Sequence, residues 1–346
     1  MNDYQNILIV RTDRIGDVIL TTPAIETVHR NFPQARITVL VSALTRDLIE
    51  GNPCVNEVLI DDRLGKHKGV GGFWRLVGEL KRRRFDLAIV VHTKKRTNLL
   101  CFWAGILERA GYRDKNFGFL LTKGFPDERH FGKKHESEYC LDLLRTMGLK
   151  VERPSMFLPL QPEAERWVQG WFNENDLSPS SKLVAVHPGA SDPTKCWPIQ
   201  SFAHLIDQLV GQHRCSVILC GGKETVTLAQ TIRSQSTQPF LDMTGKTTIA
   251  QTASLLKKCR LLVSNDSGPV HVAAAAGIYV ISLFLRNQPG INPERWKPLG
   301  PKGFVLANKP EEAVRLDRSG QIASGLRDSI TVDQVARLAK ELLQKP

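Results

Sequence analysis

The sequence lacks several features that would assign it to a familiar class. No apolar run approaches the roughly 18 residues that a membrane-spanning helix needs. The first 11 residues have too short an apolar run for a secretory signal peptide. The seven cysteines include no Cys-x-x-Cys pair, so neither a zinc site nor a disulfide framework is indicated. We therefore expect a protein of the reducing cytoplasm.

Short catalytic motifs are also missing. No Gly-x-Gly-x-x-Gly follows a strand-like run, which weakens a dinucleotide oxidoreductase hypothesis. The chain contains no Asp-x-Asp, so we expect no metal–diphosphate site of that type and no metal in the site. Gly245-Lys246-Thr247 resembles the end of a P-loop, but Phe240 stands where its first glycine is required. His135-Glu136 lacks the second histidine of a zinc-protease helix.

What the chain has is length and an uneven positive charge. With 346 residues, of which 42% are apolar, it is long enough for two domains, and its net charge is +12. Residues 63–150 hold 20 Lys and Arg against nine Asp and Glu, so nearly the whole excess lies in one quarter of the chain. Part of this excess is explained by solvated helix ends. A basic domain also suggests a polyanionic partner, namely nucleic acid, an anionic membrane or a phosphorylated glycolipid.

Short Val/Ile/Leu-rich runs alternate with amphipathic stretches, and the pattern restarts after residue 182. It predicts an α/β protein with two Rossmann-like, doubly wound domains whose ligands lie in an interdomain cleft. We expect domains at 1–160 and 161–330, and a C-terminal helix within 331–346 for which packing back on the first domain is one option. Predicted strands are 7–10, 37–41, 55–60, 87–91, 183–186, 217–220, 260–263 and 279–284; predicted helices are 18–30, 44–50, 73–83, 98–110, 163–172, 199–211, 225–234, 249–258, 270–276 and 332–344.

The first strand leads into Arg-Thr-Asp-Arg-Ile-Gly-Asp, which ends at Asp17. A carboxylate on the first strand-to-helix turn faces the expected cleft and is suited to act as a general base. The alternative is that Asp17 only caps a helix. Gly16 allows a close backbone approach in either case.

Two strand–turn–helix segments of the second half carry groups suited to phosphate. The segment 264–271 places Asp266 or Ser267 as N-cap before a helix of small residues, and helix N-termini bind anions through free amides. The segment 187–198 has the same layout and contains Lys195, which can neutralise a diphosphate. Glu224 follows another predicted strand, where it either accepts ribose hydroxyls or is an ordinary first-turn helix residue.

Taken together, these segments resemble those of the ADP-heptose–lipopolysaccharide heptosyltransferases, glycosyltransferase family 9. The matching segments occur in the family's order and are 11–17, 187–191, 195–198, 221–224 and 266–271. The resemblance implies a GT-B fold, with an N-terminal acceptor-binding domain and a C-terminal domain for the nucleotide sugar. It also implies an inverting, metal-independent transfer of heptose from ADP-heptose to the inner core of lipopolysaccharide, with no cofactor besides the donor.

The resemblance also suggests roles for individual residues. Asp17 corresponds to the catalytic aspartate and Lys195 to the phosphate-binding lysine, while Arg14 and Gly16 are assigned to acceptor binding. The donor-binding residues that it implies, together with Glu224, are Ser191, Thr194, Lys195, Lys246, Thr247, Asp266, Ser267, Gly268 and His271.

The expected partners are a nucleotide sugar and an anionic lipopolysaccharide core acceptor, met at the cytoplasmic surface of the inner membrane by a peripheral protein. Three alternatives remain open from the sequence: a family member that uses another nucleotide sugar or acceptor, a nucleotide-sugar epimerase of the same fold, and a non-catalytic basic binder of nucleotides or nucleic acid. The basic region lacks a motif in which aromatic residues alternate with basic ones, so nucleic acid is not an expected partner.

Overall fold

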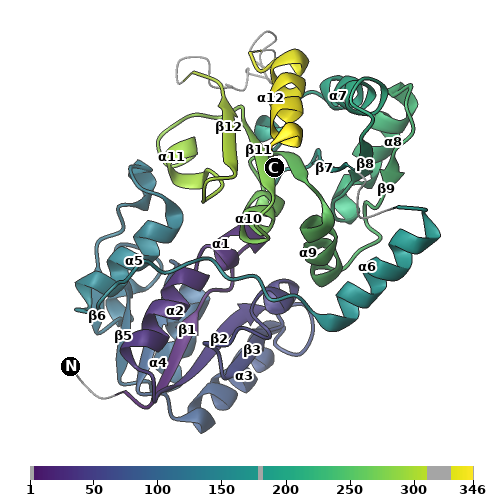
Figure 1. The fold of residues 1–346 in the computed structure, drawn as a ribbon. Helices are drawn as coiled ribbons and strands as arrows, with labels where there is room; N and C mark the ends of the chain where they lie inside the picture. The colour runs from purple at the N-terminus through teal and green to yellow at the C-terminus, as the bar shows by residue number, and fades with distance from the viewer. Residues whose placement is uncertain (1–3, 178–181, 310–328, 346) are drawn as a thin grey trace. The chain divides into compact units, whose positions relative to one another are not determined.

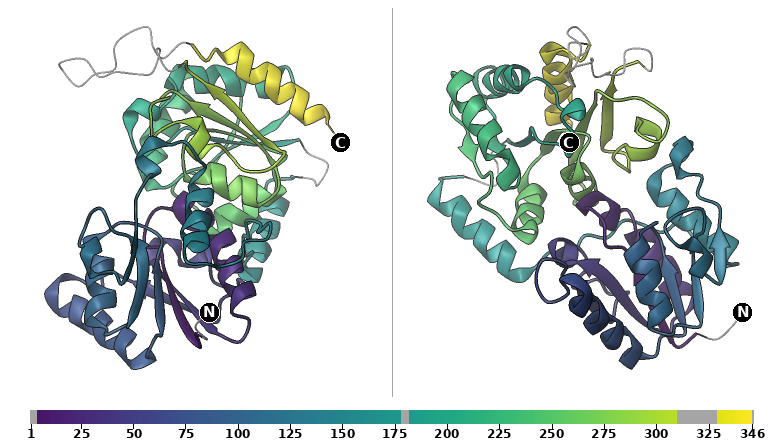
Figure 2. Two further views of the ribbon diagram at one scale, coloured as in Figure 1. Left: turned by 90° about the vertical axis from the view of Figure 1, so that its left-hand side faces the viewer. Right: turned by 180° about the vertical axis from the view of Figure 1, so that it is seen from behind.

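The computed structural model describes residues 4–177, 182–309 and 329–345. The chain divides into two compact units, Met1–Pro159 and Leu160–Pro346, so the division lies one residue before the boundary expected from the sequence. Figures 1 and 2 show that each unit is a twisted parallel sheet between two layers of helices.

The sheet of the first unit has six parallel strands in the order β3-β2-β1-β4-β5-β6. On one of its faces, α3 (Gly69–Arg83) and α4 (Lys95–Trp103) bury the alternate residues Leu8, Val10 and Val90. On the other face, α2 (Thr22–Asn31) packs against α5 (Glu136–Thr146), and both follow the short helix α1 (Ile15–Ile19) in the chain. The strands are β1 Asn6–Val10, β2 Arg36–Ser42, β3 Glu57–Asp61, β4 Leu87–Val90, β5 Glu108–Tyr112 and β6 Lys123–Phe125.

The second unit repeats this strand order with different loops. Its sheet runs β12-β11-β10-β7-β8-β9, and all its strands are parallel. One face is covered by α7, α8 and α12, whose apolar residues form one core with the strands. The strands are β7 Leu183–His187, β8 Ser216–Leu219, β9 Leu241–Asp242, β10 Leu261–Asn265, β11 Tyr279–Phe284 and β12 Gly303–Ala307; the helices are α6 Pro162–Glu174, α7 Ile199–Gly211, α8 Val226–Gln235, α9 Ile249–Lys258, α10 Gly268–Ala275, α11 Pro293–Trp296 and α12 Val332–Gln344.

The structure corrects several sequence expectations. Instead of one helix over 18–30 there are two, α1 and α2, which are separated at Leu20 and Thr21. The expected helix 98–110 ends at Trp103, because Gly105 adopts φ +74° just after it, and strand β5 follows. The segment expected to form a helix over 44–50 is the 3₁₀ helix η1, Ala43–Leu48.

The C-terminal helix α12 packs within the second unit, and the option of packing on the first domain stays a prediction. Its apolar stripe, which includes Val335, Ala339 and Leu342, joins the core formed by α7 and the strands. Among the described residues, no helix is both long and apolar enough to cross a bilayer.

Candidate active site

Each sheet has a point where the chain leaves two neighbouring strands in opposite directions, and ligands of such folds bind beside it, at the C-terminal ends of the strands. In the first unit these strands are β1 and β4, which pair in parallel. The loop after β1 leads to Asp17, which lies in the first turn of α1. The residue at the N-cap of α1 is Arg14, so the alternative of Asp17 as a helix cap was wrong.

A buried arginine organises this site. Arg11 is 1% exposed, and its Nη2 donates to Asp17 Oδ1 at 2.6 Å and to Glu136 Oε1 at 3.0 Å. Its Nε lies 3.2 Å from Asp13 Oδ2, and its Nη1 donates to the Val91 carbonyl at 2.8 Å. Three carboxylates from two distant segments therefore converge on one guanidinium.

The two aspartates of this cluster differ in their electrostatic environment. Burial raises the pKa of Asp17, and the nearby Asp13 and Glu136 charges add to this, while Arg11 only partly opposes it. Burial also acts to raise the pKa of Asp13, but His92, Arg11 and Lys94 outweigh it and hold that pKa well below its usual range. Asp13 therefore remains a carboxylate that forms an ion pair with Lys94, whose Nζ lies 2.5 Å from Oδ1, whereas Asp17 is the stronger base.

Arg14 and Gly16, assigned to acceptor binding from the resemblance, lie beside this cluster. Arg14 is exposed at the start of α1, and Gly16 is buried in its first turn, where its carbonyl accepts from Leu20 N. No contact of either residue tests its assigned role, which stays a prediction.

The sequence did not indicate Glu136 as part of the site. It was noted only as part of an incomplete zinc-helix motif, yet it begins α5 and pairs with Arg11. Arg129 Nη1 lies 3.6 Å from the same Glu136 oxygen, and its guanidinium stacks over the Tyr112 ring at 4.1 Å. These residues are separated from Arg11 by more than a hundred positions, so only the fold brings them together.

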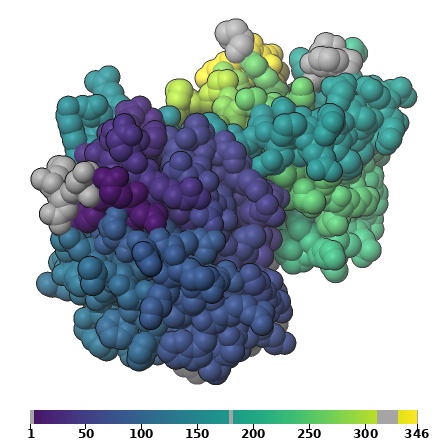
Figure 3. Space-filling view, turned by 90° about the horizontal axis from the view of Figure 1, so that it is seen from below, coloured from purple at the N-terminus to yellow at the C-terminus, as the bar shows by residue number. Residues whose placement is uncertain are grey.

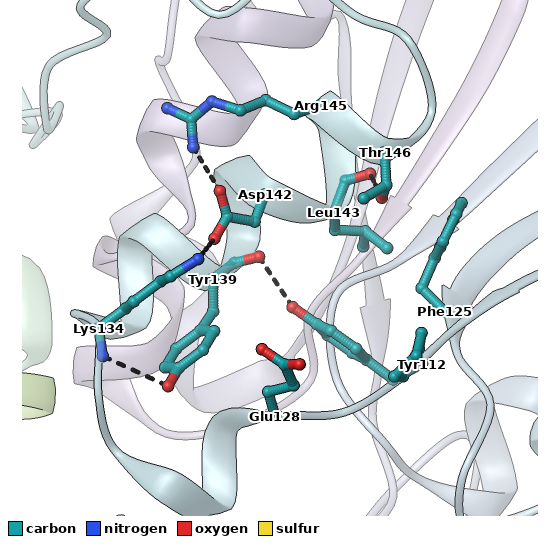
Figure 4. Close-up of a pocket in the computed structure, with 10 residues that line it drawn as sticks. Tyr112, Phe125, Glu128, Lys134, Tyr139, Asp142, Leu143, Arg145 and Thr146 are labelled. Atoms are coloured by element: carbon teal, nitrogen blue, oxygen red, sulfur yellow. Dashed lines mark hydrogen bonds and ion pairs between the residues drawn. The ribbon is translucent and has the colours of Figure 1, made fainter.

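Behind this cluster, α5 and the end of β5 line a pocket of about 330 Å³. Figure 4 shows Lys134 and Arg145 reaching Asp142 from two sides, at 2.7 and 2.6 Å. The Tyr112 hydroxyl donates to the Tyr139 carbonyl at 2.9 Å. Since both cations of the pocket wall contact carboxylates, the pocket offers phenol rings and paired charges rather than an open anion site.

In the second unit, the corresponding neighbouring strands are β7 and β10, and α10 starts after β10. Ser267 is the N-cap of α10, but its side chain makes no capping hydrogen bond. Its Oγ lies instead 2.9 Å from Ser264 Oγ and 3.2 Å from His187 Nδ1. The Ser267 side chain therefore does not cap the backbone N–H groups of the first turn. An anion that binds at a helix N-terminus accepts hydrogen bonds from such N–H groups.

Lys195 belongs to the same site. Its Nζ lies 2.5 Å from Asp266 Oδ2, and its side chain is 17% exposed. The loop that carries it is anchored by Trp197, whose backbone N–H donates to Asn265 Oδ1 and whose indole N–H donates to the Ile330 carbonyl. The lysine segment and the helix start, recognised separately in the sequence, are therefore held side by side.

Sequence reasoning missed Arg286 as a site residue. It follows β11, and its Nη1 donates to Asp192 Oδ2 at 2.7 Å. Asp192 also accepts from the backbone N–H and hydroxyl of Thr194, just before Lys195. A second cation, Arg286, thus contacts the loop that carries Lys195. The sequence placed it two residues after a predicted strand, at the border of the expected donor pocket, but gave it no role.

The remaining predicted donor residues lie around the same edge of the sheet. Loops after β7, β8 and β9 meet closely: Gly245 N donates to the Gly221 carbonyl, and a Cβ on Gly189 or Gly221 would collide with Thr225. Ser191 in the loop after β7 and Glu224 after β8 are exposed, and Lys246 is exposed with its Nζ donating to the Asp242 carbonyl. The Thr247 hydroxyl oxygen lies 2.8 Å from Thr252 Oγ1. Gly268 begins α10, and His271 is buried within that helix. Whether each contacts a donor stays a prediction.

In each unit, one buried histidine at the site has a lowered pKa. Burial lowers the pKa of His92, after β4, and of His187, at the end of β7, to about 4. Both are therefore neutral at physiological pH. His187 shares hydroxyl partners at the helix start, while His92 lies 3.9 Å from Asp13.

Comparison with known proteins agrees with this geometry. Residues 73–322 match glycosyltransferase family 9 (heptosyltransferase). Lipopolysaccharide heptosyltransferase 2 of Escherichia coli is 26% identical over 346 residues, which cover 97% of each chain. Among solved structures, the family 9 glycosyl transferase of Veillonella parvula has a TM-score of 0.88 at 24% identity, and the match covers 99% of this chain and 98% of that chain.

The structure of Escherichia coli ADP-heptose lipopolysaccharide heptosyltransferase II has a TM-score of 0.78 at 23% identity, and the match covers 98% of both chains. These likenesses confirm the GT-B fold expected from the resemblance. The family match decides against both the epimerase and the non-catalytic binder. The chain belongs to glycosyltransferase family 9, the heptosyltransferases, and is a glycosyltransferase.

Proposed function

We propose that the protein transfers a heptose from ADP-heptose to the inner core of lipopolysaccharide. The observation that carries this proposal is the pair of complementary sites: a carboxyl group with a raised pKa at Asp17, and Lys195 beside an uncapped helix start. A base and a diphosphate site are the two groups that a sugar transfer needs. The relatives named as lipopolysaccharide heptosyltransferases support the choice of sugar and acceptor.

The donor diphosphate binds the first-turn amides of α10 and Lys195. On binding, one phosphate oxygen contacts Lys195 Nζ, which already lies next to Asp266. Ser267 and Gly268 bring the helix start to the diphosphate, and Thr194 orders the lysine loop through Asp192. Ser191, His271, Glu224, Lys246 and Thr247 complete the donor site in this proposal.

In the reaction, Asp17 removes the proton of an acceptor hydroxyl while that oxygen attacks the anomeric carbon. The new carbon–oxygen bond forms on the face opposite the breaking bond to ADP, so the anomeric configuration inverts. The electron pair leaves with the diphosphate, whose growing negative charge is stabilised by Lys195 and the α10 amides. Because these groups supply positive charge, the proposed mechanism requires neither a metal nor another cofactor.

The acceptor in this proposal is the anionic core glycolipid, held by the basic first unit with Arg14 and Gly16 next to the attacking hydroxyl. Such an acceptor is reached at the cytoplasmic face of the inner membrane, where the protein acts as a peripheral enzyme. Nucleic acid is not a partner in this account.

Incubation with ADP-heptose and core-truncated lipopolysaccharides, read by mass spectrometry, tests the proposal. We expect the mass of one acceptor to rise by one heptose, with ADP released, and the same yield in excess EDTA. Transfer from a different nucleotide sugar only would overturn the choice of donor. Loss of activity with EDTA and its rescue by magnesium would contradict the metal-free mechanism.

A further inference from the structure

Helices α3 and α4 of the first unit carry large apolar side chains on their solvent side. Trp74 on α3 and Trp103 on α4 are 48% and 49% exposed, and their ring centroids are 5.4 Å apart. Phe119 and Leu107, which follow α4 in the chain, are 78% and 80% exposed. We call this set the aromatic face; its members are Trp74, Phe102, Trp103, Leu107, Phe117 and Phe119.

The aromatic face contains two groups of rings in contact: Trp74, Trp103 and Phe102, and Phe117 with Phe119. Phe102 meets Trp103 with a centroid distance of 5.4 Å, and Phe117 meets Phe119 at 5.7 Å. The second pair begins the 3₁₀ helix η2, Gly118–Leu120, which packs against α4, and Lys95 on α4 lies over the Phe117 ring. The aromatic face is therefore a surface shared by α3, α4 and η2.

These side chains are not needed to fill the core. The core beneath the two helices is made by other residues, among them Leu76, Leu80 and Leu100. Figure 3 shows that the blue part of the chain, which by residue number includes α3 and α4, is exposed on the surface of the first unit. Contiguous exposed apolar groups on a soluble protein mark an interaction site.

The surroundings of the aromatic face are strongly basic. Residues 63–107 contain 11 Lys and Arg but only Glu79 and Asp86 as acidic residues, and Glu79 Oε1 is 2.7 Å from Lys66 Nζ. Arg109 lies 5.6 Å from the Phe102 ring centroid, and Lys81 is exposed on α3. A partner that binds this surface must therefore offer both an apolar region for the exposed rings and negative charge for the surrounding Lys and Arg.

We propose that the aromatic face docks the enzyme on the surface of an anionic lipid bilayer. Trp and Phe side chains enter the interfacial layer, and the surrounding Lys and Arg contact lipid phosphates. This proposal rests on the proposed function, because an enzyme whose acceptor is a membrane glycolipid has to reach the membrane surface. A second copy is disfavoured because two faces of like charge would repel each other.

Single-stranded nucleic acid also combines negative charge with flat apolar rings, but its bases stack on aromatic side chains of the protein whose ring faces are free. Here Trp74 and Trp103 meet edge to face, and cations lie over the Phe102 and Phe117 rings. The aromatic face thus fits a lipid interface better than a row of bases.

The structure also changes which charges belong to this surface. Residues 81–84 are four basic residues in a row. Arg83 Nη2 donates to Glu57 Oε1 at 2.6 Å and its Nη1 to the Glu79 carbonyl, so this arginine has a structural role. Lys81 and Arg82 are exposed and are the better positions for charge reversal.

The test is co-sedimentation with phosphatidylcholine vesicles that contain or lack phosphatidylglycerol. We expect the wild-type enzyme to bind the anionic vesicles, less tightly as salt rises, with a blue shift of tryptophan emission. The double variant Leu107→Ser/Phe119→Ser should bind them about tenfold more weakly, because two exposed apolar groups no longer leave water. The side chains of Leu107 and Phe119 are largely exposed, so their removal should cost the fold little packing energy. The charge-reversal variant Lys81→Glu/Arg82→Glu should also weaken vesicle binding.

The matched control is Leu44→Ser, which removes an apolar side chain that is 64% exposed on η1, outside the aromatic face. It should bind vesicles like the wild type. ADP affinity should be unchanged in all variants. Heptose transfer to a delipidated acceptor should be unchanged in the Leu107/Phe119 variant and in Leu44→Ser, which separates a failure of docking from a failure of the proposed function. Equal vesicle binding by wild type and the Leu107/Phe119 variant, or tight retention of single-stranded RNA in place of vesicles, would overturn the proposal.

Discussion

The two units use the same strand order, yet their corresponding edges have opposite chemistry. In the first unit, β1 and β4 lead to three carboxylates around Arg11, one of which, Asp17, has a raised pKa. In the second, β7 and β10 lead to a helix start with Lys195 beside it. One edge is suited to accept a proton and the other to accept a diphosphate.

This comparison separates what the fold does from what the loops do. The parallel sheet determines where functional groups gather, because the loops of neighbouring strands leave at the same edge. The residues in the first turns decide the chemistry. Gly16 and Asp17 in one unit correspond in place to the Lys195 loop in the other, since both follow the first strand of their sheet.

The largest expected effect is on turnover when the base is removed. Asp17→Asn should lower kcat by about 10²–10⁴-fold, the usual contribution of a general base, while the isosteric amide keeps the packing around Arg11. Single-turnover measurements with ADP-heptose and acceptor check this.

Asp13→Asn is the matched control, because Asp13 contacts the same arginine but has a lowered pKa. Its loss of turnover should be much smaller. If Asp13→Asn were inactive and Asp17→Asn active, the roles of the two carboxyl groups would have to be exchanged.

The second effect concerns stability in acid and compares His92 with His187, the two buried histidines with a lowered pKa. A histidine with a folded-state pKa of about 4 stabilises the fold while neutral, and this contribution is lost as the pH falls from 6.5 toward 4. The pKa difference corresponds to about 3 kcal/mol for each histidine. Urea unfolding across this range should show the loss.

His187→Gln should remove the part of this pH dependence that comes from the second unit, because glutamine has no charge to gain. His92→Gln should also change the titration of Asp13, since His92 helps hold the Asp13 pKa low. An unchanged pH dependence in His187→Gln would mean that His187 is not a buried neutral group in solution.

The smallest effect should come from Arg286. Its contact with Asp192 is partly exposed, and such pairs contribute about 0.2–1 kcal/mol. Arg286→Ala should therefore weaken ADP binding only a few-fold, by loosening the Lys195 loop. A loss as large as that of a Lys195 variant would place Arg286 on the diphosphate itself.

Much of the fold was predictable from the sequence. Near-continuous apolar runs such as 7–10 and 183–186 identified the central parallel strands, which the structure confirms. The short outer strands β5, β6, β9 and β12 were missed, because they carry few β-branched residues or are too short to form a pattern. The end of α4 was missed because Gly105 was not read as a helix stop.

The sites were only partly predictable. Asp17, Lys195 and the start of α10 stand out because each lies in a strand–turn–helix segment that matches a segment of the family. Glu136 and Arg286 gave no such signal, since they reach their partners Arg11 and Asp192 from 125 and 94 positions away. The aromatic face was missed for the same reason: its rings come from separate segments that the fold brings together.

The central claim is that the base and the diphosphate site belong to different units, and calorimetric titration of ADP into a pair of variants tests it most directly. Lys195→Ala should weaken ADP binding by about 1.5–3 kcal/mol, the contribution of a hydrogen bond to a charged group, while Asp17→Asn should bind ADP like the wild type. Equal weakening in both variants, or unchanged binding in Lys195→Ala, would contradict the division of roles between the two units.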